Sequence, residues 1–163
     1  MNKTSINIVW FKRDLRFIDN EALFNAHHSA LPLLLVYFFE SSVMHYDDSD
    51  TRHWRFVYES LQDLQKKLNV IDAKIYIFQS EIQPIFSALL ENYDIKTVFS
   101  HQEIGNKITY DRDIAVQEFF QKNNIEWKEF QMHGVIRKLK SRLDWDKRWE
   151  NVMRKKKKII KES

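Results

Sequence analysis

Residues 31–39 (LPLLLVYFF) restrict the possible folds more than any other part of the chain, because the run is apolar almost without interruption. Side chains alternate between the two faces of a strand, so a strand of this composition is buried on both faces. Such strands lie inside parallel sheets that helices cover on both sides, and a proline is tolerated only near their start. The run therefore predicts an α/β fold with this strand in its interior.

Four further predicted strands alternate with helical patterns. The predicted strands are residues 5–11, 73–78, 95–100 and 125–130. The predicted helices cover residues 20–29, 51–68, 82–90 and 109–121. Asp19 is the expected N-cap of the first helix, and residues 40–50 are expected to be polar and irregular. This alternation predicts a doubly wound, Rossmann-like α/β fold with a five-stranded parallel sheet of order 3-2-1-4-5 and helices on both faces.

The chain changes character after residue 132. Residues 1–132 carry the alternating pattern and are predicted to form the α/β domain, whereas residues 133–163 are predicted to be a basic helical linker or tail that leads to an absent domain. Between residues 138 and 161, eleven Lys and Arg residues stand against three Asp and Glu residues. The like charges of residues 154–161 should repel one another, so we expect this block to be disordered.

Several classes of site are excluded by composition. The chain has no cysteine, so it offers no disulfide, thiolate metal site or cysteine nucleophile. Its two glycines cannot supply a dinucleotide or triphosphate loop. The histidines lack metal-ligand spacing, and neither a metal site nor a catalytic residue is predicted. No apolar run approaches the roughly 20 residues of a membrane span, so we expect no membrane partner and a cytoplasmic location.

The first candidate site is the charged loop of residues 12–16 (KRDLR), which follows the first strand. Ligands gather at the carboxyl ends of the strands in open α/β sheets. Arg13 and Arg16 could bind an anion there. In the alternative interpretation, Asp14 pairs with a neighbouring arginine and holds the loop.

The second candidate site follows the fourth strand, beside the point where the strand order reverses. His101, Gln102 and Glu103 offer donors and acceptors that suit the edge of a pterin-like or flavin-like ring. The alternative is that Glu103 is a solvated loop acid.

Three segments in the right order resemble the DNA photolyase and cryptochrome family. The first is VWFKRDLR at residues 9–16, followed by NEAL at 20–23; the second is RHWRFVYESL at 52–61. The third joins Gln102 and Glu103 to RDIAV at 112–116. The resemblance covers about residues 6–130. It departs from the family where Gln79 replaces a frequent glycine, and residues 134–142 do not match the commonest family linker.

The resemblance implies the amino-terminal antenna domain of a flavoprotein that repairs ultraviolet-induced pyrimidine dimers with light or signals blue light. His101, Gln102 and Glu103 would then bind a folate-type or deazaflavin-type antenna pigment. The loop residues Arg13, Asp14, Arg16 and Asn20 would lie near the domain junction in an architectural role. In the family, FAD and the DNA-binding or partner-binding surface belong to a helical domain that is absent here, so we expect no repair activity from this chain alone.

Two other interpretations stay open at this point. The chain could be a free-standing α/β module that binds a small molecule or nucleotide and contacts nucleic acid through its basic tail. It could also be a truncated gene product without a function of its own.

Overall fold

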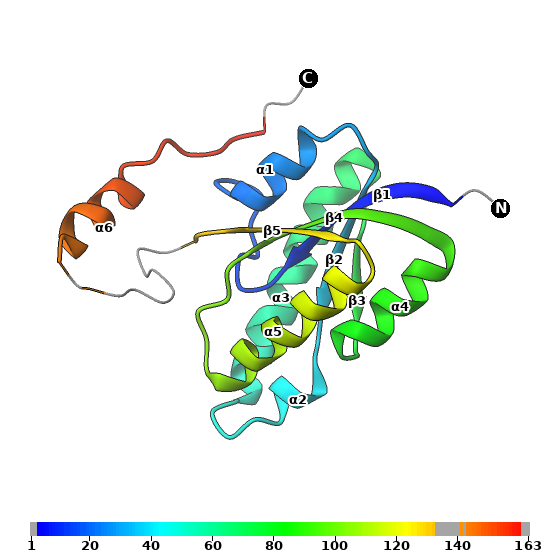
Figure 1. The fold of residues 1–163 in the computed structure, drawn as a ribbon, viewed down its shortest axis with the longest axis horizontal. Coiled ribbons are helices and arrows are strands. Elements are labelled where there is room, and N and C mark those ends of the chain that lie inside the picture. Colours follow the sequence, from blue (N-terminus) through cyan, green and yellow to red (C-terminus); the bar gives the residue numbers. More distant parts are fainter. Residues whose placement is uncertain (1–2, 133–140, 142, 161–163) are drawn as a thin grey trace.

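A single parallel sheet of order β3-β2-β1-β4-β5 forms the centre of the computed structural model, which describes residues 3–132, 141 and 143–160 (Figure 1). The strands are β1 (Thr4–Phe11), β2 (Leu33–Phe38), β3 (Ile75–Phe78), β4 (Tyr93–His101) and β5 (Glu126–Phe130). Every neighbouring pair in the sheet runs parallel. The predicted fold class and strand order are therefore confirmed.

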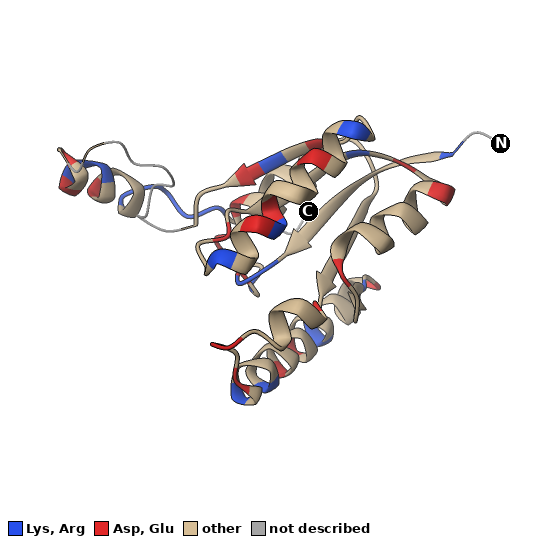
Figure 2. Ribbon diagram, turned by 60° about the horizontal axis from the view of Figure 1, so that its bottom comes forward, with Lys and Arg blue, Asp and Glu red and all other residues tan. Residues whose placement is uncertain are grey.

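The apolar strand β2 lies in the interior, as its composition predicts. It pairs with β1 on one side and with β3 on the other, and its carboxyl-terminal half is buried. No charged residue occurs in β1, β2 or β3, whereas charges of both signs lie along the helices (Figure 2). The central strands can therefore be covered on both faces without burying an ionised group.

Helices cover both faces of the sheet. The elements are α1 (Glu21–His27), α2 (Ser41–Met44), α3 (Thr51–Leu68), the 3-10 turn η1 (Asn69–Ile71), α4 (Ile82–Asn92), α5 (Lys107–Lys122) and α6 (Trp145–Met153). Phe86 of α4 and Phe120 of α5 pack with Trp10 on one face. Leu23 of α1 and Leu61 of α3 pack on the other face. No helix within the described ranges is long and apolar enough to cross a membrane.

Two local predictions are wrong. The N-cap of α1 is Asn20, whose Oδ1 accepts a hydrogen bond from Leu23 N at 2.8 Å. Asp19 instead takes a left-handed backbone conformation with φ of 55°, one residue outside the helix. The stretch predicted to be irregular contains the one-turn helix α2, whose first backbone bonds are accepted by Glu40 O from Val43 N and Met44 N.

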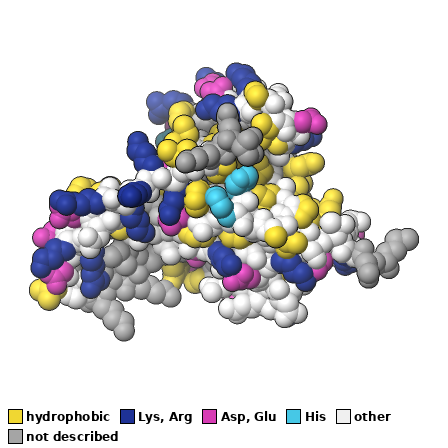
Figure 3. All heavy atoms as spheres, turned by 90° about the horizontal axis from the view of Figure 1, so that it is seen from above, with side chains coloured by type: hydrophobic (Ala, Val, Ile, Leu, Met, Phe, Trp, Pro, Cys, Tyr) yellow, Lys and Arg dark blue, Asp and Glu magenta, His cyan; other side chains and the backbone are white. Residues whose placement is uncertain are grey.

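Residues 154–160, for which the charge run predicted disorder, lie against the domain in the structure, and residue 161 is outside the described residues. Asp19 N donates to Lys158 O at 2.8 Å, and Lys158 N donates to Asp19 Oδ1 at 3.1 Å. Lys158 Nζ lies 5.3 Å from the ring centroid of Phe24, and Ile160 packs on the core beside α1. Seen from above, Lys and Arg side chains lie along this surface with apolar side chains between them (Figure 3). Of the predicted linker or tail, residues 133–140, 142 and 161–163 lie outside the described residues.

Candidate functional site

A cleft of about 700 Å³ opens at the carboxyl ends of β1 and β2. The loop after β1, the segment from Glu40 to the middle of α3, and the start of α5 enclose it. This edge of the sheet includes the boundary between β1 and β4, where the strand order reverses. Ligands of open α/β sheets bind at such switch points, and the volume lies in the range of small-molecule sites.

One wall of the cleft is aromatic and apolar. Trp54, Phe56 and Val57 from the first two turns of α3 supply it, and Leu15 faces the cleft from the loop after β1. Trp54 is fixed because its Nε1 donates to Ser49 Oγ at 2.6 Å and its ring packs edge-on against Phe39. Phe56 is 70% exposed although it is a large apolar residue. A planar ligand would cover part of this exposed ring.

The opposite wall is charged. Arg112 of α5 donates from Nη1 to Glu40 Oε1, and its Nε donates to Asp113 Oδ1 at 3.0 Å. Arg112 Nη2 lies 3.0 Å from Asp113 Oδ1 and 3.8 Å from Glu103 Oε2, whereas Glu40 Oε2 is buried without a hydrogen-bond partner among the described residues. Burial raises the pKa of Glu40 above its usual value, and the neighbouring Arg112 opposes that shift. The charged groups of this wall are therefore largely paired with one another, and one oxygen of Glu40 remains without a partner among the described residues.

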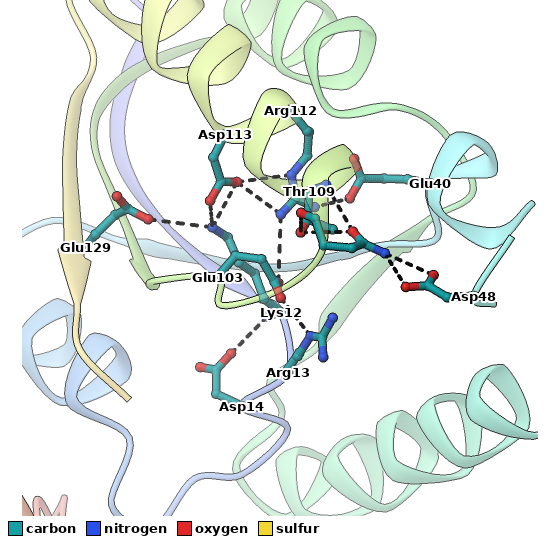
Figure 4. A network of polar contacts seen from close by, with 11 residues as sticks. Lys12, Arg13, Asp14, Glu40, Asp48, Glu103, Thr109, Arg112, Asp113 and Glu129 are labelled. Atoms are coloured by element: carbon teal, nitrogen blue, oxygen red, sulfur yellow. Dashed lines mark hydrogen bonds and ion pairs between the residues drawn. The ribbon is translucent and has the colours of Figure 1, made fainter. Parts of the chain in front are cut away.

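Lys12 also lines the cleft, and its ammonium group is surrounded by carboxylates and indole rings. Its Nζ is 3.3 Å from Asp113 Oδ1 and 3.8 Å from Glu129 Oε1 (Figure 4). The same atom lies 4.3 Å from the ring centroid of Trp10 and 5.0 Å from that of Trp127. Burial lowers the pKa of Lys12, and Asp113 opposes that shift. Lys12 thus joins β1, α5 and β5 beneath the cleft.

Glu103 connects the loop after β4 to the loop after β1. Its Oε1 lies 2.7 Å from Arg13 Nε, and the Glu103 side chain is buried whereas that of Arg13 is exposed. Gly105 allows this approach: an added Cβ would meet Thr109 Oγ1, Glu103 Oε1 at 3.0 Å and Arg13 Nη2 at 3.1 Å. The two loops are therefore packed too closely here for a larger residue.

Asp14 holds the loop after β1 from inside, but not through an arginine. Its carboxylate accepts hydrogen bonds from Lys12 N at 2.9 Å and Asn20 Nδ2 at 3.0 Å, and lies 2.6 Å from His101 Nδ1. Arg16 instead donates to the carbonyl oxygen of Asp19. The expectation that Asp14 pairs with a neighbouring arginine is wrong, although the loop is held in place.

The predicted site residues separate into two groups. Glu103, Arg13 and Arg16 line the cleft. Gln102, His101, Asp14 and Asn20 are not among its lining residues; Gln102 N donates to Phe130 O, and the other three form the Asp14 cluster. Sequence reasoning did not place Glu40 or Arg112 in the site, although both line the cleft; it considered Arg112 as part of the RDIAV motif and as a possible ion-pair partner of Asp111 or Asp113. The available signal for Glu40 was a single acid directly after the apolar strand β2.

The fold and cleft define a doubly wound α/β domain with a ligand-sized site at the carboxyl edge of its sheet. The family model for DNA photolyase matches residues 7–160, and the chain belongs to this family, as its amino-terminal α/β domain. The resemblance noted in the sequence is confirmed.

Among curated relatives, a cryptochrome DASH (chloroplastic/mitochondrial) from Arabidopsis thaliana is 30% identical over 104 residues, covering 60% of this chain and 18% of the relative. The cryptochrome DASH of Synechocystis sp. is 28% identical over 116 residues, covering 68% of this chain and 24% of the relative. The chain therefore spans less than a third of the length of these relatives.

Solved structures share the fold. The archaeal photolyase from Sulfolobus tokodaii superposes with a TM-score of 0.76 at 16% identity, covering 97% of this chain and 38% of the other. The Synechocystis cryptochrome gives a TM-score of 0.68 at 22% identity, covering 80% of this chain and 28% of the other.

Proposed function

We propose that this chain is an antenna domain that binds a light-absorbing pigment in the cleft at the carboxyl ends of β1 and β2. The observation that supports this proposal is the cleft itself, which has an aromatic wall on α3 opposite a charged wall on α5. The crystal structure of the photolyase from Sulfolobus tokodaii contains two FAD molecules and implies a novel light-harvesting cofactor. A folate-type, deazaflavin-type or flavin-type ring suits a cleft of this size and polarity.

The residues present fit such a group. Phe56 and Trp54 would lie against the ring face, and the exposed guanidinium of Arg13 would attract an anionic side chain of the pigment at the mouth. Glu103 would position Arg13 through their ion pair. Our proposal keeps Glu103 in the site, but as a residue that acts through Arg13. Gln102 and His101 would support the loop from behind.

When bound, the pigment would absorb light and pass the excitation to a flavin. The chain's own contribution would be to hold the ring in one orientation and to keep it away from water. The rest of the family architecture enters as a proposal: a second, helical domain would supply FAD and the contact with DNA, for light-driven repair or for blue-light signalling. This chain alone would then be non-catalytic. The cytoplasmic location expected from the sequence is part of this proposal.

A titration tests the proposal. The purified chain is titrated with FMN, a deazaflavin and a reduced folate, and binding is followed by the red shift of pigment absorbance. Phe56→Ala should raise the dissociation constant of the pigment about tenfold, which corresponds to ~1.4 kcal/mol of binding free energy, because one ring contact is lost. Tyr58→Ala is the matched control, since Tyr58 is an exposed aromatic residue of α3 that does not line the cleft. If none of the pigments binds, or if both variants bind alike, the proposed site is wrong.

One observation favours a second candidate, contact of the tail with nucleic acid. Lys155, Lys156 and Lys157 are exposed, whereas Lys158 is partly covered by α1. Three or four phosphate contacts would give a log–log salt slope of about −3 to −4 on duplex DNA. Replacement of the three exposed lysines by glutamine should abolish that slope, while Lys66→Gln and Lys67→Gln on α3 should not change it.

A further inference from the structure

The two edge strands of the sheet differ in charge. The edge strand β5 carries Glu126, Lys128 and Glu129, whereas the edge strand β3 (IYIF) carries no charged residue. Charged side chains on an edge strand oppose pairing with another chain, and an uncharged, apolar edge lacks that protection. Of the two edges, β3 is therefore the one whose sequence permits a further strand.

The backbone of β3 directs hydrogen-bonding groups away from the sheet. The residue after β2 donates its backbone N–H to Phe78 O at 2.7 Å, so the polar groups of Phe78 face β2. Backbone groups alternate in direction along a strand, so those of Ile75 and Ile77 face the open side, where no strand within the described residues pairs with them. Gln65 of α3 covers one end of this side, because its Oε1 accepts from Ile75 N at 3.0 Å and its Nε2 donates to Ala73 O at 3.1 Å. The amide and the carbonyl of Ile77 therefore face outward beyond the reach of that cover.

Apolar side chains are exposed on both faces of this edge. Tyr76 is 43% exposed on the face of the sheet that α4 and α5 cover, and Ile77 is 44% exposed on the face that α3 covers. The side of α3 next to this edge is uncharged, with Tyr58, Gln62, Gln65 and Asn69 at helical spacing. A second copy of the chain would therefore meet apolar and amide side chains here, without like charges that repel it.

We propose that two copies of this chain associate through β3 in an antiparallel pair centred on Ile77, which joins their sheets into one continuous sheet. The two copies exchange two hydrogen bonds, because Ile77 N of each donates to Ile77 O of the other across a two-fold axis. Lys74 stands before β3 and Glu81 after it. Antiparallel pairing brings the Lys74 end of one strand toward the Glu81 end of the other, whereas a parallel pair would bring like charges together.

The size of the edge sets the strength of the association. A strand of four residues offers a small contact area, and interfaces below about 1,200 Å² are typical of transient complexes. We therefore expect a reversible dimer whose population rises with protein concentration.

Sedimentation velocity of the full chain over a concentration series measures this association. The wild-type chain should shift from monomer to dimer as its concentration rises. Ile77→Lys should raise the dissociation constant at least about tenfold, because the two lysines would lie opposite each other across the two-fold axis. The matched control is Ile114→Lys on α5, where the isoleucine is 43% exposed, and its dissociation constant should stay within about twofold of wild type. Circular dichroism checks that both variants are folded.

Disulfide formation locates the contact independently. The chain has no cysteine, so Ile77→Cys introduces a single thiol. Directly opposed residues of a hydrogen-bonded antiparallel pair have Cα atoms about 5.5 Å apart, which is within the range of a disulfide. Oxidised glutathione should therefore convert Ile77→Cys to a covalent dimer on a non-reducing gel, and should convert the control Ile114→Cys several-fold less.

Two results would overturn the inference. A chain that stays monomeric at every concentration would leave the β3 edge to an extended segment of another protein. A dimer that Ile77→Lys does not weaken, or in which both cysteine variants cross-link equally, would place the contact elsewhere. Neither result bears on pigment binding, because no residue of β3 lines the cleft.

Discussion

Asp14 Oδ2 lies 2.6 Å from Nδ1 of His101, and this contact joins the loop after β1 to the last residue of β4. Both side chains are almost fully buried. Asn20, the N-cap of α1, donates to the same carboxylate oxygen. One carboxylate therefore joins the end of β4, the loop after β1 and the start of α1.

Asp14→Asn should destabilise the chain by about 3 kcal/mol, because an amide NH₂ would face donors that need an acceptor. The measurement is the free energy of unfolding in urea. Asp63→Asn serves as the control, since Asp63 forms an exposed ion pair with Lys66 on α3 and should cost less than ~1 kcal/mol. Equal losses in the two variants would contradict the role given to Asp14.

The stability contributed by Asp14 should disappear in acid. Burial by itself raises the pKa of Asp14, but hydrogen bonds from His101 and from Lys12 N outweigh it and hold the pKa below the usual range. A carboxyl whose folded pKa is lowered adds stability above its unfolded pKa and loses it as pH falls through the folded pKa. The stability difference between wild type and Asp14→Asn should therefore shrink as urea unfolding is repeated from pH 7 down to 3. A constant difference would rule this out.

The contribution of Glu40 to stability should change with pH in the opposite direction. Burial raises its pKa above the usual value. A carboxyl with a raised folded pKa contributes stability that is fully present below its unfolded pKa and is lost as pH rises through the folded pKa. The stability of wild type relative to Glu40→Gln should therefore fall as pH rises from about 4 to 7. A rise over that range would show that the ion pair with Arg112 outweighs burial.

Gly105→Ala should destabilise the chain by about 1–3 kcal/mol, as is usual for an overpacked position. The added methyl group would meet Thr109 Oγ1 and press on the ion pair between Glu103 and Arg13. Thr109→Ala removes one obstacle, so the double variant should lose less than the sum of the two single variants. Strict additivity in urea unfolding would mean that the loop moves away instead.

Asp19→Gly should release the tail without unfolding the domain. Glycine takes the φ of 55° freely but lacks the oxygen that accepts from Lys158 N. We expect trypsin to cut after residues 155–158 at least several-fold faster, with global stability within ~0.5 kcal/mol of wild type. Asp72→Gly, at a φ of 51° far from the tail, is the control. Unchanged cleavage would show that Asp19 does not hold the tail.

The sheet could be predicted from sequence because its signals are local. The composition of residues 31–39 favours two buried faces, and the alternation of strands and helices then limits the strand order to a few doubly wound arrangements. The site depends on pairs that no local pattern connects. Glu40 and Arg112 are separated by 72 residues, and Asp14 and His101 by 87. The motif around Glu103 indicated a loop that lines the cleft, but the partner of its carboxylate, Arg13, became visible only in three dimensions.

The stacked rings of Trp10 and Trp127 give the protein an internal optical reporter. Their centroids are 5.8 Å apart and their planes differ by 21°, with one ring on β1 and the other on β5. Two indoles at this separation couple their electronic transitions and give a paired circular dichroism signal. A second indole pair on α6, Trp145 and Trp149, can be removed by Trp149→Phe. The remaining signal would then report whether β1 and β5 keep their relative positions, in real time and without any added label.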